Sequence, residues 1–411
     1  MSIEWRFARS STAHGDTPSE VHYYTRCFPQ TGGAESLGNI IDAVKPRRWR
    51  VLAPRVTSAL SPADHRFWHA ETPWTILDDQ LRDEPTILQA ALTILQVGDE
   101  HFKWPFPIAR FGRLLAIERS ETENLRALET LIQNYMTANP VQSPLSIAVF
   151  GSPGNGKSFA IKALAAGLSS ERALSDLTFN LSQFSSPDAI TNSLHQVRDV
   201  ALSGKMPLVF WDEFDSAYEA QPLGWLRFFL APMQDGTFLE DAFTHNIGKA
   251  IFVFAGGTFD TKKDFMHAVE ADKKEKKAKA EDFLSRLRGY LEIPDLNHSD
   301  GRLSAAVTLR RAVRLRRLLA ESAGNLVQQY AGRGDELREE LNADENVLRA
   351  CLTIPKYNHG ARSIEAIVKM SALSKRMRYG PSSLPPEGQL GLHVDAEVFL
   401  ALLRGPSAGT V

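Results

Sequence analysis

Apolar and polar residues recur along this chain in two periods, and the changes between them predict its domains. Between residues 146 and 293, short apolar runs rich in β-branched and aromatic residues predict buried strands, and the stretches between them have the spacing of amphipathic helices. Strands that alternate with helices predict a mainly parallel sheet covered by helices on both faces. The apolar runs are SIAVF, LTFNL, PLVFW, KAIFVFAGG and GYLEI.

The regions on either side of this α/β segment have different patterns. Residues 1–105 contain five of the seven tryptophans, which suits a compact accessory domain of short elements whose fold the sequence does not define. Residues 106–145 are predicted to be a linker and a helix that lead into the α/β domain, residues 146–300. Residues 301–380 have helical periods throughout, and residues 381–411 form a C-terminal segment with a flexible tail.

The strand SIAVF runs directly into the glycine-rich loop GSPGNGKS, and a helical period begins at Lys157. This spacing fits the phosphate-binding pattern G-x-x-x-x-G-K-[ST], in which glycines let backbone N–H groups turn toward phosphate oxygens at a helix N-terminus. We expect Lys157 to reach the β- and γ-phosphates and the Ser158 hydroxyl to ligate Mg²⁺. A glycine-rich turn that binds nothing is the alternative. The residues expected at the nucleotide are Gly151, Ser152, Pro153, Gly154, Asn155, Gly156, Lys157, Ser158 and Phe159.

A pair of acids follows a later apolar run, in PLVFWDEFDS. Open α/β sheets bind their ligands at the carboxyl ends of the strands, so Asp212 and Glu213 are expected at the same edge as the glycine loop. Asp212 is suited to organise Mg²⁺ through its water shell, and Glu213 to accept a proton from the water that attacks the γ-phosphate. A pair of exposed acids at the end of a strand is the alternative.

These two motifs resemble the Walker A and Walker B motifs of the AAA+ ATPases, and further residues match that superfamily in the expected order. In AIFVFAGGTFD, Thr258 corresponds to the sensor 1 residue, although many members have asparagine there. In DFLSRLRGYLEI, Arg286 resembles the arginine finger that acts on a neighbouring subunit, with Arg288 as its alternative. In HGARSIEAIVKMS, Arg362 resembles the sensor 2 arginine of Clp-type unfoldases. Each arginine also has a structural alternative, as a surface or ion-pairing residue.

The resemblance implies a five-stranded αβα nucleotide-binding domain followed by an α-helical lid, with ATP and Mg²⁺ bound between them. An arginine finger supplied by a neighbour implies a homo-oligomeric ring, most often a hexamer. Hydrolysis in such a ring implies an ATPase that remodels a macromolecular partner, foremost a protein substrate or a partner enzyme. A nucleic-acid-associated ATPase and a nucleotide-dependent assembly switch are the alternatives.

Three further stretches bear on what the protein binds. Phe184 corresponds to the aromatic pore-loop residue of protein-translocating AAA+ rings, and a core phenylalanine is the alternative. The helical stretch GRLSAAVTLRRAVRLRRLLA carries a cluster of arginines, which predicts a solvated helix face or, alternatively, a nucleic-acid patch. For the adenine base, the resemblance favours residues just before the first strand, namely Ile108, Phe111 and Gly112, and a linker packed on the sheet is the alternative.

Composition bears on the partners and the compartment that we expect for the protein. A formal net charge of −2 at pH 7 gives no global attraction to nucleic acid or to an anionic membrane. The two cysteines, Cys27 and Cys351, favour neither a disulfide framework nor a zinc site, and the sequence displays no zinc ligand set. The first residues lack the apolar segment of a signal peptide, and no apolar run approaches the ~20 residues that span a bilayer. We therefore expect a cytoplasmic protein without a membrane partner.

Overall fold

The computed structural model describes residues 75–139, 143–168, 174–275, 279–298, 302–331, 337–374 and 376–404. The chain divides into two compact units, and all the described residues belong to the second unit, Thr72–Val411. Most of the predicted accessory domain, residues 1–74, and the last part of the predicted C-terminal segment, residues 405–411, lie outside the described residues.

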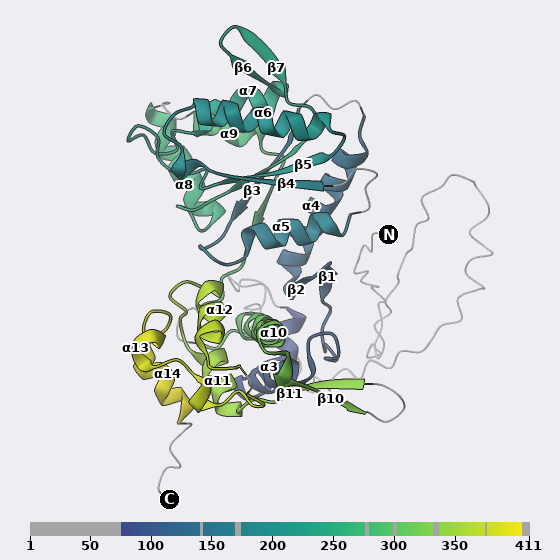
Figure 1. Cartoon of the computed structure of the whole chain (residues 1–411), viewed down its shortest axis with the longest axis vertical. Coiled ribbons are helices and arrows are strands. Elements are labelled where there is room, and N and C mark those ends of the chain that lie inside the picture. The colour runs from purple at the N-terminus through teal and green to yellow at the C-terminus, as the bar shows by residue number, and fades with distance from the viewer. Residues whose placement is uncertain are drawn as a thin grey trace, which may run out of the picture. The chain divides into compact units, whose positions relative to one another are not determined.

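A five-stranded parallel sheet forms the centre of the α/β domain (Figure 1). The strands follow the order β4-β5-β8-β3-β9, so the first of them in the chain, β3, lies between the fourth and the fifth. The predicted fold class, an αβα domain with a five-stranded parallel sheet followed by a helical lid, is confirmed. The strands are β3 (Leu145–Phe150), β4 (Leu174–Asn180), β5 (Met206–Asp212), β8 (Ile251–Ala255) and β9 (Gly289–Glu292).

Both faces of this sheet are buried, because alternate residues of the central strands point to opposite sides. In β3, Ile147 and Val149 pack into one hydrophobic core, whereas Ala148 and Phe150 pack into another. In β5 the same alternation places Phe210 in one core and the residues before and after it in the other. A strand that is apolar on both faces has no polar positions to alternate, which is why the three central strands, β3, β5 and β8, are continuous apolar runs in the sequence.

Helices cover both faces of the sheet, as Figure 1 shows. One face packs against α4 (Arg119–Thr137) and α5 (Lys157–Ala166). The other packs against α6 (Asp188–Leu202), η3 (Leu226–Phe229), α7 (Leu230–Asp235), α8 (Lys262–Glu275) and α9 (Ala280–Arg286). The remaining elements of this domain are η2 (Leu181–Gln183) and two antiparallel hairpins, β1 (Ala109–Phe111) with β2 (Leu114–Ala116) and β6 (Thr237–Glu240) with β7 (Phe243–Asn246).

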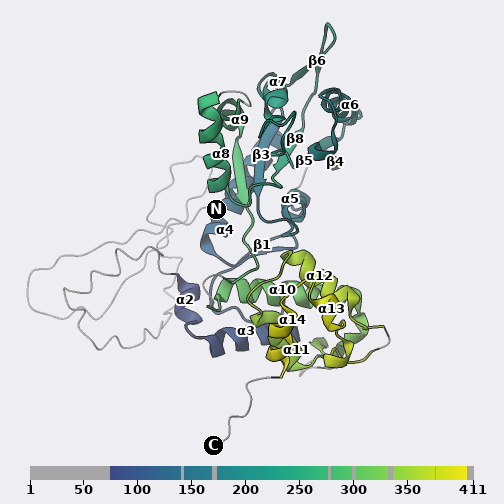
Figure 2. The ribbon, with the colours of Figure 1, turned by 90° about the vertical axis from the view of Figure 1, so that its left-hand side faces the viewer.

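The helical lid has a hydrophobic core of its own, and α3 contributes to it. Helix α3 packs along α10 (Figure 2), although the sequence groups its residues with the accessory domain. The accessory domain that the sequence predicts for residues 1–105 thus stays a prediction for the residues that precede α2. The elements of this core are α2 (Ile76–Gln80), α3 (Glu84–Val97), α10 (Ala305–Ser322), η4 (Gly324–Leu326), α11 (Glu345–Thr353), α12 (Ala361–Met370), η5 (Pro381–Ser383), α13 (Glu387–Leu390) and α14 (Ala396–Leu403).

One segment of the lid is not helical, contrary to the expectation for residues 301–380. Strands β10 (Val327–Ala331) and β11 (Leu337–Leu341) form an antiparallel hairpin. Two glycines in the sequence GRGDE, residues 332–336, lower the helix propensity of this part of the chain.

The arginines of α10 are turned into the molecule, which contradicts both a solvated helix face and a nucleic-acid patch. The reason is that α3 and the chain before α4 cover the side of the helix that the sequence alone leaves open. The arginines of this helix form ion pairs that join Arg310 to Glu118 and Glu121, Arg316 to Glu339, and Arg317 to Asp99.

Arg311 is the most buried of these cations, with 1% of its surface exposed. Its guanidinium donates hydrogen bonds to backbone carbonyls of two separate segments, the linker after β9 and the end of α11. The accepting carbonyls are those of Leu296, Leu352, Ile354 and Pro355. One side chain therefore satisfies buried carbonyl groups that no regular element pairs, and it fixes the linker against α11.

We expect Arg311→Met to destabilise the protein strongly, because methionine fills the space but leaves the Leu296 and Ile354 carbonyls without a donor. The other two carbonyls keep a contact with His298. Each unsatisfied buried polar group costs about 1–3 kcal/mol, so the free energy of unfolding should fall by about 3 kcal/mol or more. Urea unfolding measures this loss. The control is Arg349→Met, which removes an exposed i,i+4 pair on α11 and should cost less than about 0.5 kcal/mol. Equal losses in the two variants would contradict the role given to Arg311.

Candidate functional site

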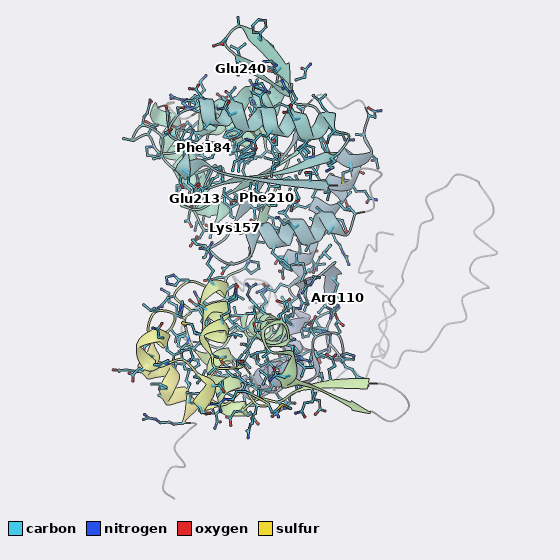
Figure 3. All side chains as sticks on the ribbon, viewed as in Figure 1. Arg110, Lys157, Phe184, Phe210, Glu213 and Glu240 are labelled. Atoms are coloured by element: carbon cyan, nitrogen blue, oxygen red, sulfur yellow. The ribbon has the colours of Figure 1, made fainter. Side chains whose placement is uncertain are left out.

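The carboxyl ends of the strands bring the predicted motifs to one edge of the sheet. Asp212, the last residue of β5, pairs with Ala255 at the end of β8, and Ala255 pairs with Val149 in β3. The loop after β3, the acids after β5 and the turn after β8 therefore leave the sheet side by side. Figure 3 shows Lys157 and Glu213 at this edge.

The loop between β3 and α5 has the backbone that its glycines permit. Gly154 and Gly156 have φ values of 87° and 89°, in the left-handed region that favours glycine. Lys157 begins α5, and its Nζ donates a hydrogen bond to the carbonyl oxygen of Gly151 at 2.6 Å. The ammonium group thus lies over the loop, close to the loop's first residue. The loop ends at the N-terminus of α5, and a cation beside a helix N-terminus is an arrangement suited to bind an anion.

The charged groups at this edge act on one another. Burial lowers the pKa of Lys157, and the negative charges of Asp260, Asp215 and Asp212 oppose that shift. Burial raises the pKa of Asp212, an effect that Lys157 opposes and the Glu213 charge reinforces. The site therefore holds one amine and several carboxylates in a partly desolvated region. The amine is suited to pair with a bound anion, and the carboxylates with a bound cation.

Glu213 follows β5 in a constrained backbone conformation. Its N–H donates to the Ala255 carbonyl oxygen at 2.9 Å, which extends the sheet pairing by one residue. Its φ of 55° then turns the chain sharply away. The side chain lies against Gly257, where a Cβ atom would come within 2.7 Å of the Glu213 Cγ. A glycine at position 257 is thus what leaves room for this glutamate.

Asp215 is a buried residue of the site that the sequence reasoning missed. Only 3% of its surface is exposed, and its carboxylate accepts hydrogen bonds from the N–H groups of Gly257, Thr258 and Phe259 at 2.8–2.9 Å. It therefore fixes the turn after β8 against the end of β5. The one signal for it in the sequence is its place as the third acid in WDEFDS.

Two of the predicted site residues lie where the loop after β3 meets the lid. Asn155 donates from Nδ2 to the Asp295 carboxylate at 3.2 Å, and its Oδ1 accepts from the N–H of Ala361 at 3.3 Å. The stem of Arg362 lies over the loop, since a Cβ at Gly154 would come within 2.6 Å of the Arg362 Cγ. The predicted sensor 2 residue and the glycine loop are thus in contact.

A cavity of about 450 Å³ opens beside this junction. Its walls come from the β1–β2 hairpin, the start of α5, the linker after β9, and α10. Arg314 of α10 lines it, and the Nη1 atom of that residue lies 3.9 Å from where a Cβ of Gly156 would stand. The Nε atom of Arg314 is buried and has no hydrogen-bond partner among the described residues. Phe159, 43% exposed, forms part of the opposite wall.

The residues predicted to hold adenine do not line this cavity. Phe111 is buried in the core between the sheet and α5, and Gly112 lies against the Ala163 carbonyl. Ile108 packs on the core of the lid. The residues that line the cavity here come after the hairpin turn: Arg113 to Leu115 and Ile117. They belong to the turn, to β2 and to the chain just after it, and not to β1.

Arg286 and Phe184 contact groups outside the glycine loop. Arg286 ends α9 and donates to the Asp282 carbonyl of its own helix, and Arg288 is exposed just before β9. Phe184, labelled in Figure 3, is partly buried and packs its ring on Trp225 with the centroids 6.2 Å apart. This contact favours the packing interpretation of Phe184 over a free pore-loop aromatic.

Comparison with known proteins finds a likeness among solved structures. No family model matches the chain, and no curated protein matches it. Among solved structures, the chain is similar to the ORC2 protein of Aeropyrum pernix in its ADPNP–ADP complexes, with a TM-score of 0.41 and 12% identity over 71% of this chain and 70% of that chain. The class of the protein follows from its own architecture: an αβα P-loop domain followed by a helical lid. Throughout the described ranges, every helix is too short or too polar to cross a membrane.

We expect Asp215→Asn to loosen the turn after β8 while the fold persists, because the amide keeps the shape but replaces one accepting oxygen by a donor. The loss of one or two hydrogen bonds to a buried group should raise the exchange rate of the amides at 257–259 by about tenfold or more, since ~1.4 kcal/mol corresponds to a factor of ten. Hydrogen exchange measures this directly. The exposed Asp235, changed to asparagine, serves as the control. Unchanged exchange at 257–259 in the Asp215 variant would refute the anchoring role.

Proposed function

We propose that this protein is an Mg²⁺-dependent ATPase of the AAA+ type, which hydrolyses ATP to ADP and phosphate. One observation carries the proposal: the Lys157 amine lies across a glycine loop at the sheet edge where Asp212 and Glu213 also emerge. A cation at a helix N-terminus suits the triphosphate, and the neighbouring acids suit a metal ion and a water molecule.

Each residue has a defined role in this proposal. Lys157 and the N–H groups of the loop hold the β- and γ-phosphates, while Ser158 and Asp212 hold Mg²⁺ by the oxygen ligands that this ion prefers. The ion neutralises phosphate charge. Glu213 orients a water molecule in line with the γ-phosphate and accepts its proton, and Thr258, in the turn fixed by Asp215, orients the same water.

The nucleoside is proposed to occupy the cavity beside Gly156 and Phe159. A volume of about 450 Å³ is in the range of small-molecule sites. Arg362 and Arg314 approach the loop from the lid, so both are suited to sense the phosphates. Closing of the lid on ATP would then be coupled to the charge of the nucleotide, because guanidinium groups recognise phosphate oxygens.

We further propose that the protein acts as a homo-oligomeric ring on a macromolecular partner, most favourably a protein. Leu239 and Phe243 on the β6–β7 hairpin are 63% and 72% exposed, and exposed apolar side chains favour contact with a protein. The nucleic-acid alternative has lost its main sequence argument, since most arginines of α10 are engaged inside the molecule. ATPase assays with unfolded protein, DNA and RNA separate the alternatives: stimulation by nucleic acid alone would refute the protein proposal.

We expect Lys157→Ala to abolish ATP binding and Glu213→Gln to retain it while stopping hydrolysis. The first change removes the amine from the phosphate loop; the second preserves shape but cannot accept a proton, a role that contributes about 10²–10⁴-fold in rate. Fluorescent-nucleotide binding and phosphate release measure the two effects. Lys162→Ala, on the solvent side of the same helix, is the matched control and should retain both. Near wild-type turnover in the glutamine variant would refute the base assignment.

We expect Arg286→Ala to bind ATP but to hydrolyse it ~10³-fold more slowly, if the arginine acts on a neighbouring subunit as a finger. Mixing this variant with Glu213→Gln should restore part of the activity, because some interfaces then pair an intact Glu213 with an intact Arg286. Arg288→Ala is the matched control. Formation of mixed oligomers without any recovery, or a fully active Arg286 variant beside an inactive Arg288 variant, would show that the finger is another residue.

A further inference from the structure

Three side chains with metal-ligating atoms converge on the side of the α/β domain that carries α6. They are His195 of α6, Glu240 at the end of β6 and His245 of β7, and one ligand atom of each lies within 4.8 Å of the others. The Glu240 Oε2 atom is 2.9 Å from the His195 Nε2 and 3.4 Å from the His245 Nε2. Figure 3 shows Glu240 at the opposite end of the α/β domain from Lys157.

The hairpin explains why these residues meet. Phe238 pairs with His245 and Glu240 pairs with Phe243, so Phe238, Glu240 and His245 share one face of the hairpin, which packs on α6. Phe238 is buried and contacts both imidazoles: its ring stacks on His245 with centroids 5.2 Å apart and meets His195 edge-on at 4.8 Å. A rigid aromatic platform therefore holds both rings before any ligand binds.

We propose that His195, Glu240 and His245 form a zinc site, separate from the Mg²⁺ of the nucleotide site. Two imidazoles and a carboxylate are a ligand set that proteins use for Zn²⁺, whereas Mg²⁺ takes oxygen ligands. Zinc bonds of about 2.0–2.2 Å in a tetrahedron separate neighbouring ligand atoms by roughly 3.4 Å, so small side-chain rotations suffice here. The Glu240 side chain is 46% exposed, which leaves the fourth position open to water.

One neighbour must move when the ion binds. Arg198 lies 3.2 Å through Nη1 from the Nδ1 of His245, and it also contacts the Asp199 carboxylate through Nε and Nη2. A zinc ion on Nε2 requires the imidazole proton on Nδ1, which Arg198 as a donor opposes. Arg198 then turns toward Asp199, and the imidazole Nδ1–H faces solvent.

The consequence of zinc binding is a cross-link between α6 and the β6–β7 hairpin. The hairpin leads directly into β8, and β8 ends in the turn that contains Thr258. The same hairpin carries the exposed Leu239 and Phe243. An ion at this position therefore fixes the hairpin that carries the two exposed apolar side chains, which the proposed function assigns to contact with a protein partner. The zinc site itself does not depend on that function.

The test measures Zn²⁺ binding to the full-length protein by isothermal titration, with Co²⁺ spectra to report the ligand geometry. We expect His195→Gln, Glu240→Gln and His245→Gln each to lower the affinity of one zinc equivalent by about 100-fold or more, since even loss of a partner outside the ligand set costs 10–100-fold. His267→Gln, an exposed histidine on α8, is the matched control and should bind as the wild type does.

A second measurement locates the ion without any variant. Hydrogen exchange of the wild-type protein with and without Zn²⁺ should show slower exchange in residues 237–246 and in α6, and no such change in the Glu240→Gln protein. Unfolding curves without zinc show whether each variant is folded. Equal zinc affinity and stoichiometry in the wild type and the three variants, or unchanged exchange in the hairpin, would overturn the proposal.

Discussion

The carboxylate of Asp215 is the contact on which the arrangement of the sheet edge depends. It lies buried between the end of β5 and the turn after β8, and it accepts the N–H groups of three successive residues. An acceptor buried this deeply must be fully bonded, so the turn has only one favourable position. That position leaves Glu213 beside Gly257 and presents Thr258 at the same edge. The relative placement of Glu213 and Thr258, the proposed base and the proposed sensor, therefore depends on one buried side chain.

A second polar contact connects this edge to the lid. Asn155, in the glycine loop, bonds both to Asp295 in the linker and to the N-terminus of α12. Gly360 must be a glycine here, because its φ is 53° and a Cβ would collide with Asn155 Oδ1. The glycine loop after β3 and the helix that carries Arg362 thus share a hydrogen bond.

The sequence predicts those parts of the molecule that local patterns determine. The strands were recognisable because each is an apolar run bounded by turn residues, and the loop after β3 because its glycines, lysine and serine are consecutive. The burial of the α10 arginines could not be predicted, because helical spacing tells which residues share a face but not that α3 covers that face. Asp215, the lining of the cavity and the His195, Glu240 and His245 cluster were missed for the same reason. Their partners lie far away in the sequence, and only the tertiary fold defines the pairs.

The cavity beside the glycine loop is bordered by two contacts of unequal strength. On one side, Arg310 joins α10 to Glu118 and Glu121; burial alone would lower the pKa of Arg310, and the two carboxylates raise it nonetheless. On the other side, Asn155 makes one hydrogen bond to the Asp295 carboxylate and one to a backbone N–H group. Separating a buried guanidinium from its carboxylates costs about 3–5 kcal/mol. Breaking one of the hydrogen bonds of Asn155 costs about 1–3 kcal/mol, which is less. Movement of the lid is therefore expected to open the cavity on the Asn155 side, with the Arg310 pairs as the hinge, so that the end beside the glycine loop is the end that opens.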